Sequence, residues 1–344
     1  HKVKLTIKVD FKTQSKASLS AMILSGSIGV WMAYTGWGVW ALVFQSLLNS
    51  LLLTVSFFYL VHWRPLLIFS IKSFNNLFSF GSKLLLSGMI NTVYRNLYTI
   101  VIGKKFSAAE LGYYTRADQF AIYPSANLNG IICRVMYPIL SSIQDDNERL
   151  AEVYRKYIRY SSYIIFPLMT MLAALAQPMV ELLLTDKWSG IVILLQILCF
   201  DWMFDHLSII NLNLLYVKGR SDLAFKLEVI KKSIAITILF ISIPLGLIGI
   251  CWGRVLYSLI ASYMNTYYTK SLIGLSFLDQ IKDVLPSLLL AFFMGIVIYG
   301  LTCMKLSNIT HLVIGVSIGV VFYIFFSIVF KIDSYKQIYQ LLHK

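Results

Sequence analysis

The chain has 344 residues, of which 58% are hydrophobic and only 13% are charged. A soluble globular protein carries about 25% charged residues, so a water-soluble fold could not cover its surface with so few. The formal net charge of +14 can indicate nucleic acid as a partner, but the positive-inside rule gives a simpler source for it in a membrane protein. These totals predict an all-α polytopic membrane protein.

Apolar segments long enough to cross a bilayer recur along the whole chain. A helix needs about 20 mostly apolar residues to span the hydrocarbon core. Ten segments meet this description, and the last 11 residues, with Ile338, Leu341 and Leu342 on one face, fit an amphipathic helix on the membrane surface. The predicted spans are residues 19–34, 39–61, 77–103, 111–143, 157–184, 191–217, 227–243, 247–268, 285–304 and 312–330.

The basic residues alternate with these spans. With ten crossings, both termini and every second connection share one side, and that side holds 22 of the 30 Lys and Arg residues. The opposite side holds 5, and the remaining three are Arg95, Arg134 and Arg254, within spans. Because Lys and Arg concentrate in cytoplasmic loops, this bias predicts that both termini face the cytoplasm.

No enzyme or metal motif stands out in the sequence. The four cysteines lie in apolar runs without a CxxC pair, which favours small buried hydrophobic residues over a metal or redox site. Asp145 and Asp146 could hold a metal, but the Asn-Glu-Arg that follows favours a helix N-cap instead. We therefore expect no cofactor, no metal and no catalytic residues.

Ionisable residues within spans are the informative ones, because they are costly in lipid and usually functional. They are Arg95, Arg134 and Arg254, together with Asp201 and Asp205, which are one turn apart and so share a helix face. For any single residue a structural ion pair or snorkelling to the interface is an equal alternative. Three arginines in one bundle favour a cavity that binds an anion, and the arginine fork suits phosphate well.

Specific runs resemble the bacterial polysaccharide transporter family. Residues 78–124 contain the FSFG start and the LGYY turn before Arg116, and residues 134–146 read RVMYPILSSIQDD. The run AYTGWGVWALVFQ at residues 33–45 fits as well. This family includes the Wzx-type flippases for lipid-linked oligosaccharides and belongs to the multidrug/oligosaccharidyl-lipid/polysaccharide exporter superfamily.

The resemblance implies a two-lobe helical bundle whose first four helices precede this chain. Residues 1–61 would hold a basic cytoplasmic loop and the last two N-lobe helices, and residues 62–80 the cytoplasmic or interfacial segment between the lobes. Residues 81–269 would form the six-helix C-lobe, 270–330 two extra helices, and 331–344 a cytoplasmic amphipathic tail. Tyr98 stands where many relatives carry an acidic residue, which puts the family's ion coupling in doubt here.

The implied function is a flippase. It would move undecaprenyl-pyrophosphate-linked oligosaccharide across the bacterial inner membrane for O-antigen, capsule or exopolysaccharide assembly, by alternating access around a cationic lumen. Arg95, Arg134 and Arg254 would contact the pyrophosphate or line the lumen, with Arg116 near the outer mouth. Asp201 and Asp205 are candidates for ion coupling. Implied partners are the lipid bilayer, a polysaccharide polymerase and a chain-length regulator, but no nucleic acid.

Three alternatives stay open. A cation-coupled drug exporter of the same superfamily would favour acidic residues in the lumen over arginines. A membrane-embedded polysaccharide-modifying enzyme would need a longer acidic or histidine-containing loop. A non-transporting paralogue would fit an incomplete N-lobe.

Overall fold

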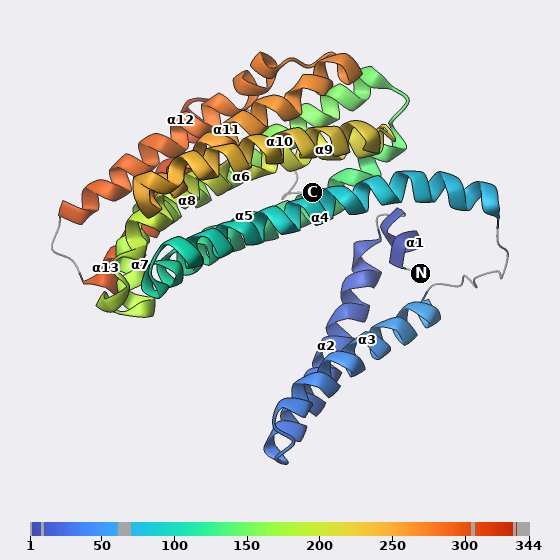
Figure 1. The fold of residues 1–344 in the computed structure, drawn as a ribbon, viewed down its shortest axis with the longest axis horizontal. Helices are drawn as coiled ribbons and strands as arrows, with labels where there is room; N and C mark the ends of the chain where they lie inside the picture. Colours follow the sequence, from blue (N-terminus) through green and yellow to red (C-terminus); the bar gives the residue numbers. More distant parts are fainter. Residues whose placement is uncertain (1, 8–9, 61–69, 304–306, 333–334, 336–344) are drawn as a thin grey trace. The chain divides into compact units, whose positions relative to one another are not determined.

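The structure is a computed structural model that describes residues 2–7, 10–60, 70–303, 307–332 and 335. These residues form helices joined by short turns, with no strand among them, which confirms the all-α prediction (Figure 1). The chain divides into two compact units, residues 1–74 and 75–344.

The first unit is a helical hairpin with a short helix before it. Its helices are α1 (Lys2–Ile7), α2 (Phe11–Tyr34) and α3 (Val39–Leu60). The buried face of α2 repeats a small residue every fourth position, at Ala17, Ala21, Ser25 and Gly29. Small residues let membrane helices approach closely, so this stripe explains the pairing of α2 with α3.

The turn between α2 and α3 depends on glycine. Gly36 and Gly38 have φ angles of +86° and +52°, which residues with a Cβ rarely adopt. At the other end of α2, the Asp10 carboxylate accepts a hydrogen bond from the Thr13 amide at 3.1 Å and caps the helix. This cap starts α2 eight residues before the span predicted at residue 19, so part of the predicted basic loop is helical.

The second unit is a bundle of ten α-helices in its described part. Within it α6 packs against α12, α5 against α8 and α9, α10 against α11, and α12 against α13. The helices are α4 (Ile71–Lys105), α5 (Ala108–Ser142), α6 (Asn147–Ala174), α7 (Ala176–Leu184), α8 (Ile191–Met203), α9 (Asp205–Val217), α10 (Ser221–Ser242), α11 (Gly246–Ile273), α12 (Phe277–Gly300) and α13 (Asn308–Val329).

Side-chain caps set where several of these helices begin. Ser107 and Ser276 form capping boxes with Glu110 and Asp279 at the starts of α5 and α12. The Asp146 carboxylate accepts from the Arg149 amide at 3.0 Å, which confirms the N-cap predicted for the Asp145–Asp146 pair. Such caps satisfy amide groups that have no partner within the helix.

Several predicted spans are broken helices. The segment predicted at 157–184 bends by 65° where α6 passes to α7. The segment at 191–217 breaks at Phe204, between α8 and α9. Between α10 and α11 lies a short 3-10 turn, Ile243–Leu245, followed by Gly246 at φ +76°.

Six helical stretches among the described residues are long and apolar enough to cross a membrane, or seven if the bent α6–α7 pair counts as one. One of the six, Ser221–Ile273, is 53 residues long and folds back on itself as the α10–α11 hairpin. The long helices α4 and α5 are not among the six, and both carry charged residues along their length. The protein is therefore a multi-pass membrane protein, while the count of ten crossings remains the sequence prediction.

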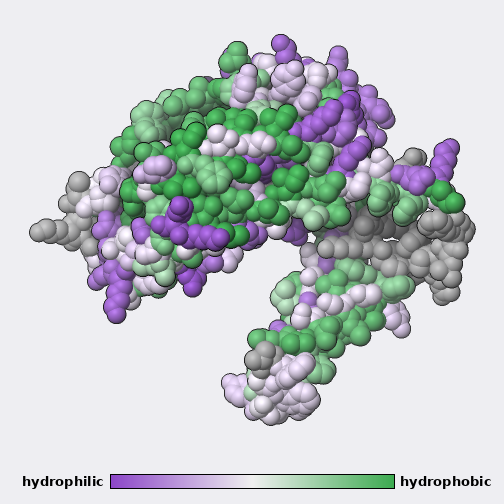
Figure 2. All heavy atoms as spheres, viewed as in Figure 1, coloured by the Kyte–Doolittle hydropathy of each residue, from purple (hydrophilic) through white to green (hydrophobic). Residues whose placement is uncertain are grey.

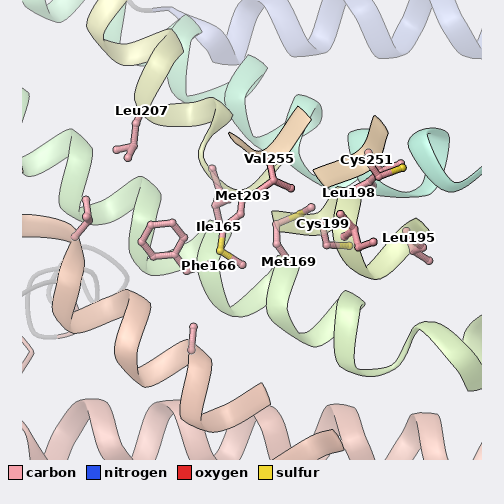
Figure 3. Packing of buried hydrophobic residues seen from close by; sticks show 14 of the residues in the cluster. Ile165, Phe166, Met169, Leu195, Leu198, Cys199, Met203, Leu207, Cys251 and Val255 are labelled. Atoms are coloured by element: carbon pink, nitrogen blue, oxygen red, sulfur yellow. The ribbon is translucent and has the colours of Figure 1, made fainter. Parts of the chain in front are cut away.

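Core and surface are both apolar, as expected for a protein in lipid. Large buried side chains from α6, α8 and α11, including Phe166, Leu198 and Val255, interdigitate in the middle of the bundle (Figure 3). Many large apolar side chains also point outward, such as Ile241 and Val321, each 67% exposed. Hydrophobic residues cover much of the visible helical surface (Figure 2). Exposure of such side chains to water would cost about 1.5–3 kcal/mol each, whereas lipid removes that cost.

One predicted boundary differs from the structure, and one predicted segment lies mostly outside the described residues. The segment predicted to join the lobes, residues 62–80, is helical from Ile71, where α4 begins. The spacing of apolar residues hid this start because Lys72, Asn75 and Asn76 interrupt the run. The predicted amphipathic tail lies outside the described residues, apart from 331, 332 and 335.

Candidate functional site

The centre of the second unit holds an arginine between two carboxylates. Arg254 on α11 places Nη1 2.7 Å from Asp118 Oδ1 on α5 and Nη2 2.5 Å from Asp201 Oδ2 on α8. The Arg254 side chain is only 12% exposed. Because a buried charge is tolerated only when it is paired and hydrogen-bonded, these contacts hold three helices around one guanidinium. We call Asp118, Asp201 and Arg254 the central cluster.

Aromatic side chains enclose the central cluster. The guanidinium carbon of Arg254 lies 5.5 Å from the Trp202 ring centroid and 5.6 Å from that of Tyr98. Its Nη1 also donates to the Tyr114 hydroxyl at 2.7 Å, while Trp202 Nε1 donates to Asp118 Oδ1 at 2.9 Å. Cation–π contacts and hydrogen bonds therefore fix the arginine in one position.

The break at Phe204 separates the two predicted coupling carboxylates. Asp201 pairs with Arg254, whereas Asp205 begins α9 and accepts a hydrogen bond from Asn129 Nδ2 on α5 at 3.1 Å. Asp201 and Asp205 thus lie on either side of a one-residue break at Phe204 and have different described partners. The neighbouring His206 is fully buried and its ring nitrogens bond to Ser162 Oγ and the Met203 carbonyl oxygen.

A second group of buried charges lies on α10. Lys231 forms a close ion pair with Glu228, and Lys232 Nζ lies 4.0 Å from the same carboxylate. Lys232 also donates to Tyr257 Oη at 3.1 Å and lies 4.2 Å from the ring centroid of Tyr94. Both lysines lie within the predicted span 227–243, although the charge count includes them among the 22 basic residues on the cytoplasmic side. They are buried on α10, which begins at Ser221, so counting them as cytoplasmic loop charges is wrong.

The charges of this centre are nearly balanced. Among the described residues it contains three basic side chains and four acidic ones. They are Lys231, Lys232 and Arg254 against Asp118, Asp201, Asp205 and Glu228. The described charges of this centre thus form a mixed polar network.

The other predicted arginines do not join the central cluster. Arg116 is exposed and donates to Gln119 Oε1 at 2.9 Å, and Arg134 is exposed with Nε donating to the Gly130 carbonyl oxygen at 3.0 Å. Arg134 lies 16 residues beyond Asp118 on α5, about 24 Å along the axis at 1.5 Å per residue. Arg95 lies on α4, and its side chain is outside the described part of the structure.

A third charged group lies near the start of α12, at the end of the unit. Asp283 Oδ2 accepts from Arg155 Nε at 2.7 Å, and Asp283 Oδ1 lies 2.6 Å from Arg159 Nη2. Both arginines are on α6, so this group, which we call the rim cluster, fastens α6 to α12. Cavities of about 620 and 510 Å³ open beside it, the first lined largely by α6 and the second by α12 and the residues after α13.

Sequence reasoning missed Asp118, Glu228 and Asp283. Asp118 lies inside the predicted span 111–143, so the rule that flagged the arginines would have flagged it too. Asp283 and its arginines looked like ordinary loop charges, because their pairing joins residues more than 120 positions apart. No group of three or more His, Cys, Asp or Glu residues in the described ranges is placed to hold a metal ion.

Comparison with known proteins places these features in a wider context. The protein family described as "Polysaccharide biosynthesis protein" matches residues 1–193. The chain is 31% identical over 265 residues to the lipopolysaccharide biosynthesis protein WzxC of Escherichia coli K12, covering 74% of this chain and 54% of that protein. It is 25% identical over 328 residues to the teichuronic acid biosynthesis protein TuaB of Bacillus subtilis 168, covering 92% and 67%.

A transport protein and a solved structure are also similar. The succinoglycan biosynthesis transport protein ExoT of Rhizobium meliloti 1021 shares 23% identity over 185 residues, which is 54% of this chain and 37% of ExoT. The lipid II flippase MurJ in an inward closed conformation superposes with a TM-score of 0.62 at 19% identity, over 93% of this chain and 67% of that one. The chain thus spans about half the length of several curated relatives, and the MurJ likeness establishes the fold.

Proposed function

The chain belongs to the polysaccharide biosynthesis protein family, and from this we propose that it forms part of a flippase for lipid-linked oligosaccharide. The substrate we propose is an oligosaccharide on undecaprenyl pyrophosphate, moved for O-antigen, capsule or exopolysaccharide assembly. The membrane would be the bacterial inner membrane, with both ends of this chain at the cytoplasmic face. The names of WzxC, TuaB and ExoT support the pathway, and the fold shared with MurJ supports the mechanism.

The observation that carries this proposal is the charged network within apolar helices. Seven ionisable side chains from α5, α8, α9, α10 and α11 meet in a unit whose outer surface is largely hydrophobic. Buried charge is costly in a membrane protein and is retained where a polar solute or ion must pass. A polar oligosaccharide head needs such a path, because it must cross about 30 Å of hydrocarbon.

We assign the residues different parts in this activity. Arg95 and Arg134, with Arg116 toward the outer mouth, would contact the pyrophosphate, since none of the described contacts of Arg116 or Arg134 is to an acidic group. Arg254 would position α5, α8 and α11, because two carboxylates already compensate its charge. Asp205, hydrogen-bonded by Asn129, is a candidate for ion coupling beside Asp201. Alternating access would rearrange the helices that meet at these residues.

A cation-coupled exporter is the second candidate, and one observation favours it. The central cluster has two carboxylates for one arginine, which leaves it acidic, as a proton- or cation-coupled carrier requires. A membrane-embedded enzyme that modifies polysaccharide is a weaker alternative, because the named relatives are biosynthesis and transport proteins. Partners such as a polymerase and a chain-length regulator remain part of the proposal.

The test is genetic and chemical, in the organism that carries the gene. Deleting the gene should abolish surface polysaccharide and cause lipid-linked oligosaccharide to accumulate, and the restored gene should reverse both effects. Arg134→Ala should lose at least tenfold in surface polysaccharide at normal membrane levels, because a bidentate phosphate contact of about 1.5–3 kcal/mol disappears. Lys104→Ala, which removes an exposed basic residue at the end of α4, should have no effect.

The outcomes separate the candidates. Unchanged polysaccharide after deletion, together with increased drug susceptibility, would contradict the flippase and favour the drug exporter. Normal polysaccharide in both Arg95→Ala and Arg134→Ala, with the deletion still defective, would overturn only the pyrophosphate-binding role of these arginines.

A further inference from the structure

The cavity of about 510 Å³ beside the rim cluster combines a basic edge with an apolar wall. Its basic lining residues are Arg159, Lys282 and Lys331, and Asp283 is the one acidic residue among those that line it. The apolar wall includes Leu289 and Phe293 of α12 and Phe330 at the end of α13. A small water-soluble anion would not be stabilised by the apolar wall. The combination of a basic edge and an apolar wall therefore indicates an amphipathic ligand.

The depth of the wall matches one leaflet of a bilayer. Lys282 lies in the second turn of α12, and Phe293 follows it by 11 residues, about 16 Å along the helix axis. Half of a hydrocarbon core is about 15 Å thick. Leu289 and Phe293 are 47% and 56% exposed, so an acyl chain can lie against them while a headgroup stays level with Lys282.

The lysine on the other side of the cavity is held in an unusual backbone conformation. Lys331 has φ +50° and directly follows the C-cap of α13. Its amide bonds to the Ile328 carbonyl oxygen at 3.1 Å, and the Ile332 amide bonds to Ser327 O at 3.0 Å, which together form a Schellman motif. Glycine usually occupies this position, because a Cβ is strained there. Lys331 therefore places its charge at the end of α13, beside the cavity.

The third basic group is oriented by the rim cluster. Arg159 reaches the cavity edge from α6, where Asp283 Oδ1 accepts from its Nε at 2.7 Å. Asp283 is buried, with a side chain only 3% exposed, and binds Arg155 as well. Among the described residues that line the cavity, three are basic and one is acidic.

We propose that this cavity binds an anionic glycerophospholipid. The phosphate lies between Lys282 and Lys331, and one acyl chain follows Leu289 and Phe293 along α12. Basic pockets between transmembrane helices at the membrane surface suit such headgroups. The lipid is a resident of the protein rather than its cargo, so the inference goes beyond the proposed transport and does not depend on it.

Native mass spectrometry of the purified chain in detergent tests the proposal, with phosphatidylglycerol and phosphatidylcholine as probes. Phosphatidylglycerol should be retained more strongly than phosphatidylcholine. Each of Lys282→Gln and Lys331→Gln should weaken phosphatidylglycerol retention about fivefold, and the double variant about thirtyfold, since a basic residue near an anionic lipid contributes about 1 kcal/mol. Lys270→Gln, an exposed lysine in the last turn of α11, should change nothing.

Two further arms identify the ligand class. Phe293→Ala should reduce retention of both phospholipids, because it shortens the apolar wall, while glycerol phosphate without acyl chains should not compete. Equal retention of phosphatidylglycerol and phosphatidylcholine would overturn the proposal, as would wild-type retention in the double variant. Displacement of phosphatidylglycerol by undecaprenyl phosphate at a tenth of its concentration would also overturn it, because the cavity would then belong to the polyprenyl substrate.

Discussion

The central cluster and the rim cluster use the same two side-chain types in opposite proportions. In the centre one arginine, Arg254, serves two carboxylates, and all three side chains are at most 24% exposed. At the rim two arginines serve one carboxylate, Asp283, and these arginines are 37% and 31% exposed. Among the residues that the structure describes, a buried group is therefore shared in both places. Inside the bundle it is a cation between two carboxylates, and at the end it is a carboxylate between two arginines.

This difference indicates that the exposure of an ion pair determines how strongly its loss destabilises the protein. A buried charge that water cannot reach is stabilised only by its protein partners. Removal of one member of the central cluster should therefore destabilise the contacts between all three helices. A partly exposed arginine can be solvated when its partner is lost, so the rim cluster tolerates change. Three substitutions test this contrast.

The largest effect is expected from Arg254→Met. It leaves Asp118 and Asp201 buried without their cation, which typically destabilises a protein by about 3–5 kcal/mol. We expect loss of folded protein from membranes and, in detergent, a much lower midpoint of thermal unfolding. Adding Asp118→Asn and Asp201→Asn should recover most of the stability, because the triple variant has no unpaired charge. A stable single variant would break the comparison, since it would show that the centre is well hydrated.

A smaller effect is expected from Asp283→Asn. The change removes the acceptor of both arginines, but Arg155 and Arg159 can turn toward water or headgroups. We expect a loss of about 1.5–3 kcal/mol, the range for a hydrogen bond to a charged group, measured as the shift in thermal unfolding. Asp279→Asn, a surface carboxylate four residues earlier that caps α12, is the matched control and should lose about 1 kcal/mol or less. If Asp283→Asn proved as damaging as Arg254→Met, exposure would not explain the difference between the clusters.

The smallest effect, of opposite sign, is expected from Lys331→Gly. Glycine relieves the strain at φ +50°, although it also gains freedom in the unfolded chain, so a net stabilisation of about 0.5 kcal/mol is expected in detergent without anionic lipid. Lys331→Ala keeps the strain and should show no such gain. A rise in the unfolding midpoint for both variants would mean that the lysine charge, rather than the backbone, is unfavourable there.

The sequence was sufficient to predict most helix-forming regions and the membrane character, because both depend on long local runs of apolar residues. It missed α1 (Lys2–Ile7), which lies in the predicted basic loop. It also identified Arg254 and Asp201 as buried ionisable residues and Asp146 as a cap. The resemblance in the FSFG and LGYY runs led to the family that the comparisons confirm. These signals are local, and their meaning does not require knowledge of which helices are neighbours.

The ion pairs could not be predicted, because they join residues whose proximity depends on which helices are neighbours. Arg254 finds Asp118 136 residues away, and Arg155 finds Asp283 128 residues away, so neither pair has a local pattern. The break at Phe204 has no proline or glycine to mark it. The surroundings of Lys231 and Lys232 are not visible in the sequence either, because their contacts with Glu228, Tyr94 and Tyr257 exist only in the folded bundle.

Trp202 gives the central cluster an optical reporter. Its indole nitrogen donates to Asp118 and its ring lies against the guanidinium of Arg254, whereas Trp31, Trp37, Trp40 and Trp252 are at least half exposed on the outer surface. Indole emission responds to nearby charge and to the polarity around the ring. Any step that separates Asp118 from Arg254 should therefore change the emission of this tryptophan, so helix rearrangement can be followed by fluorescence in real time without a label.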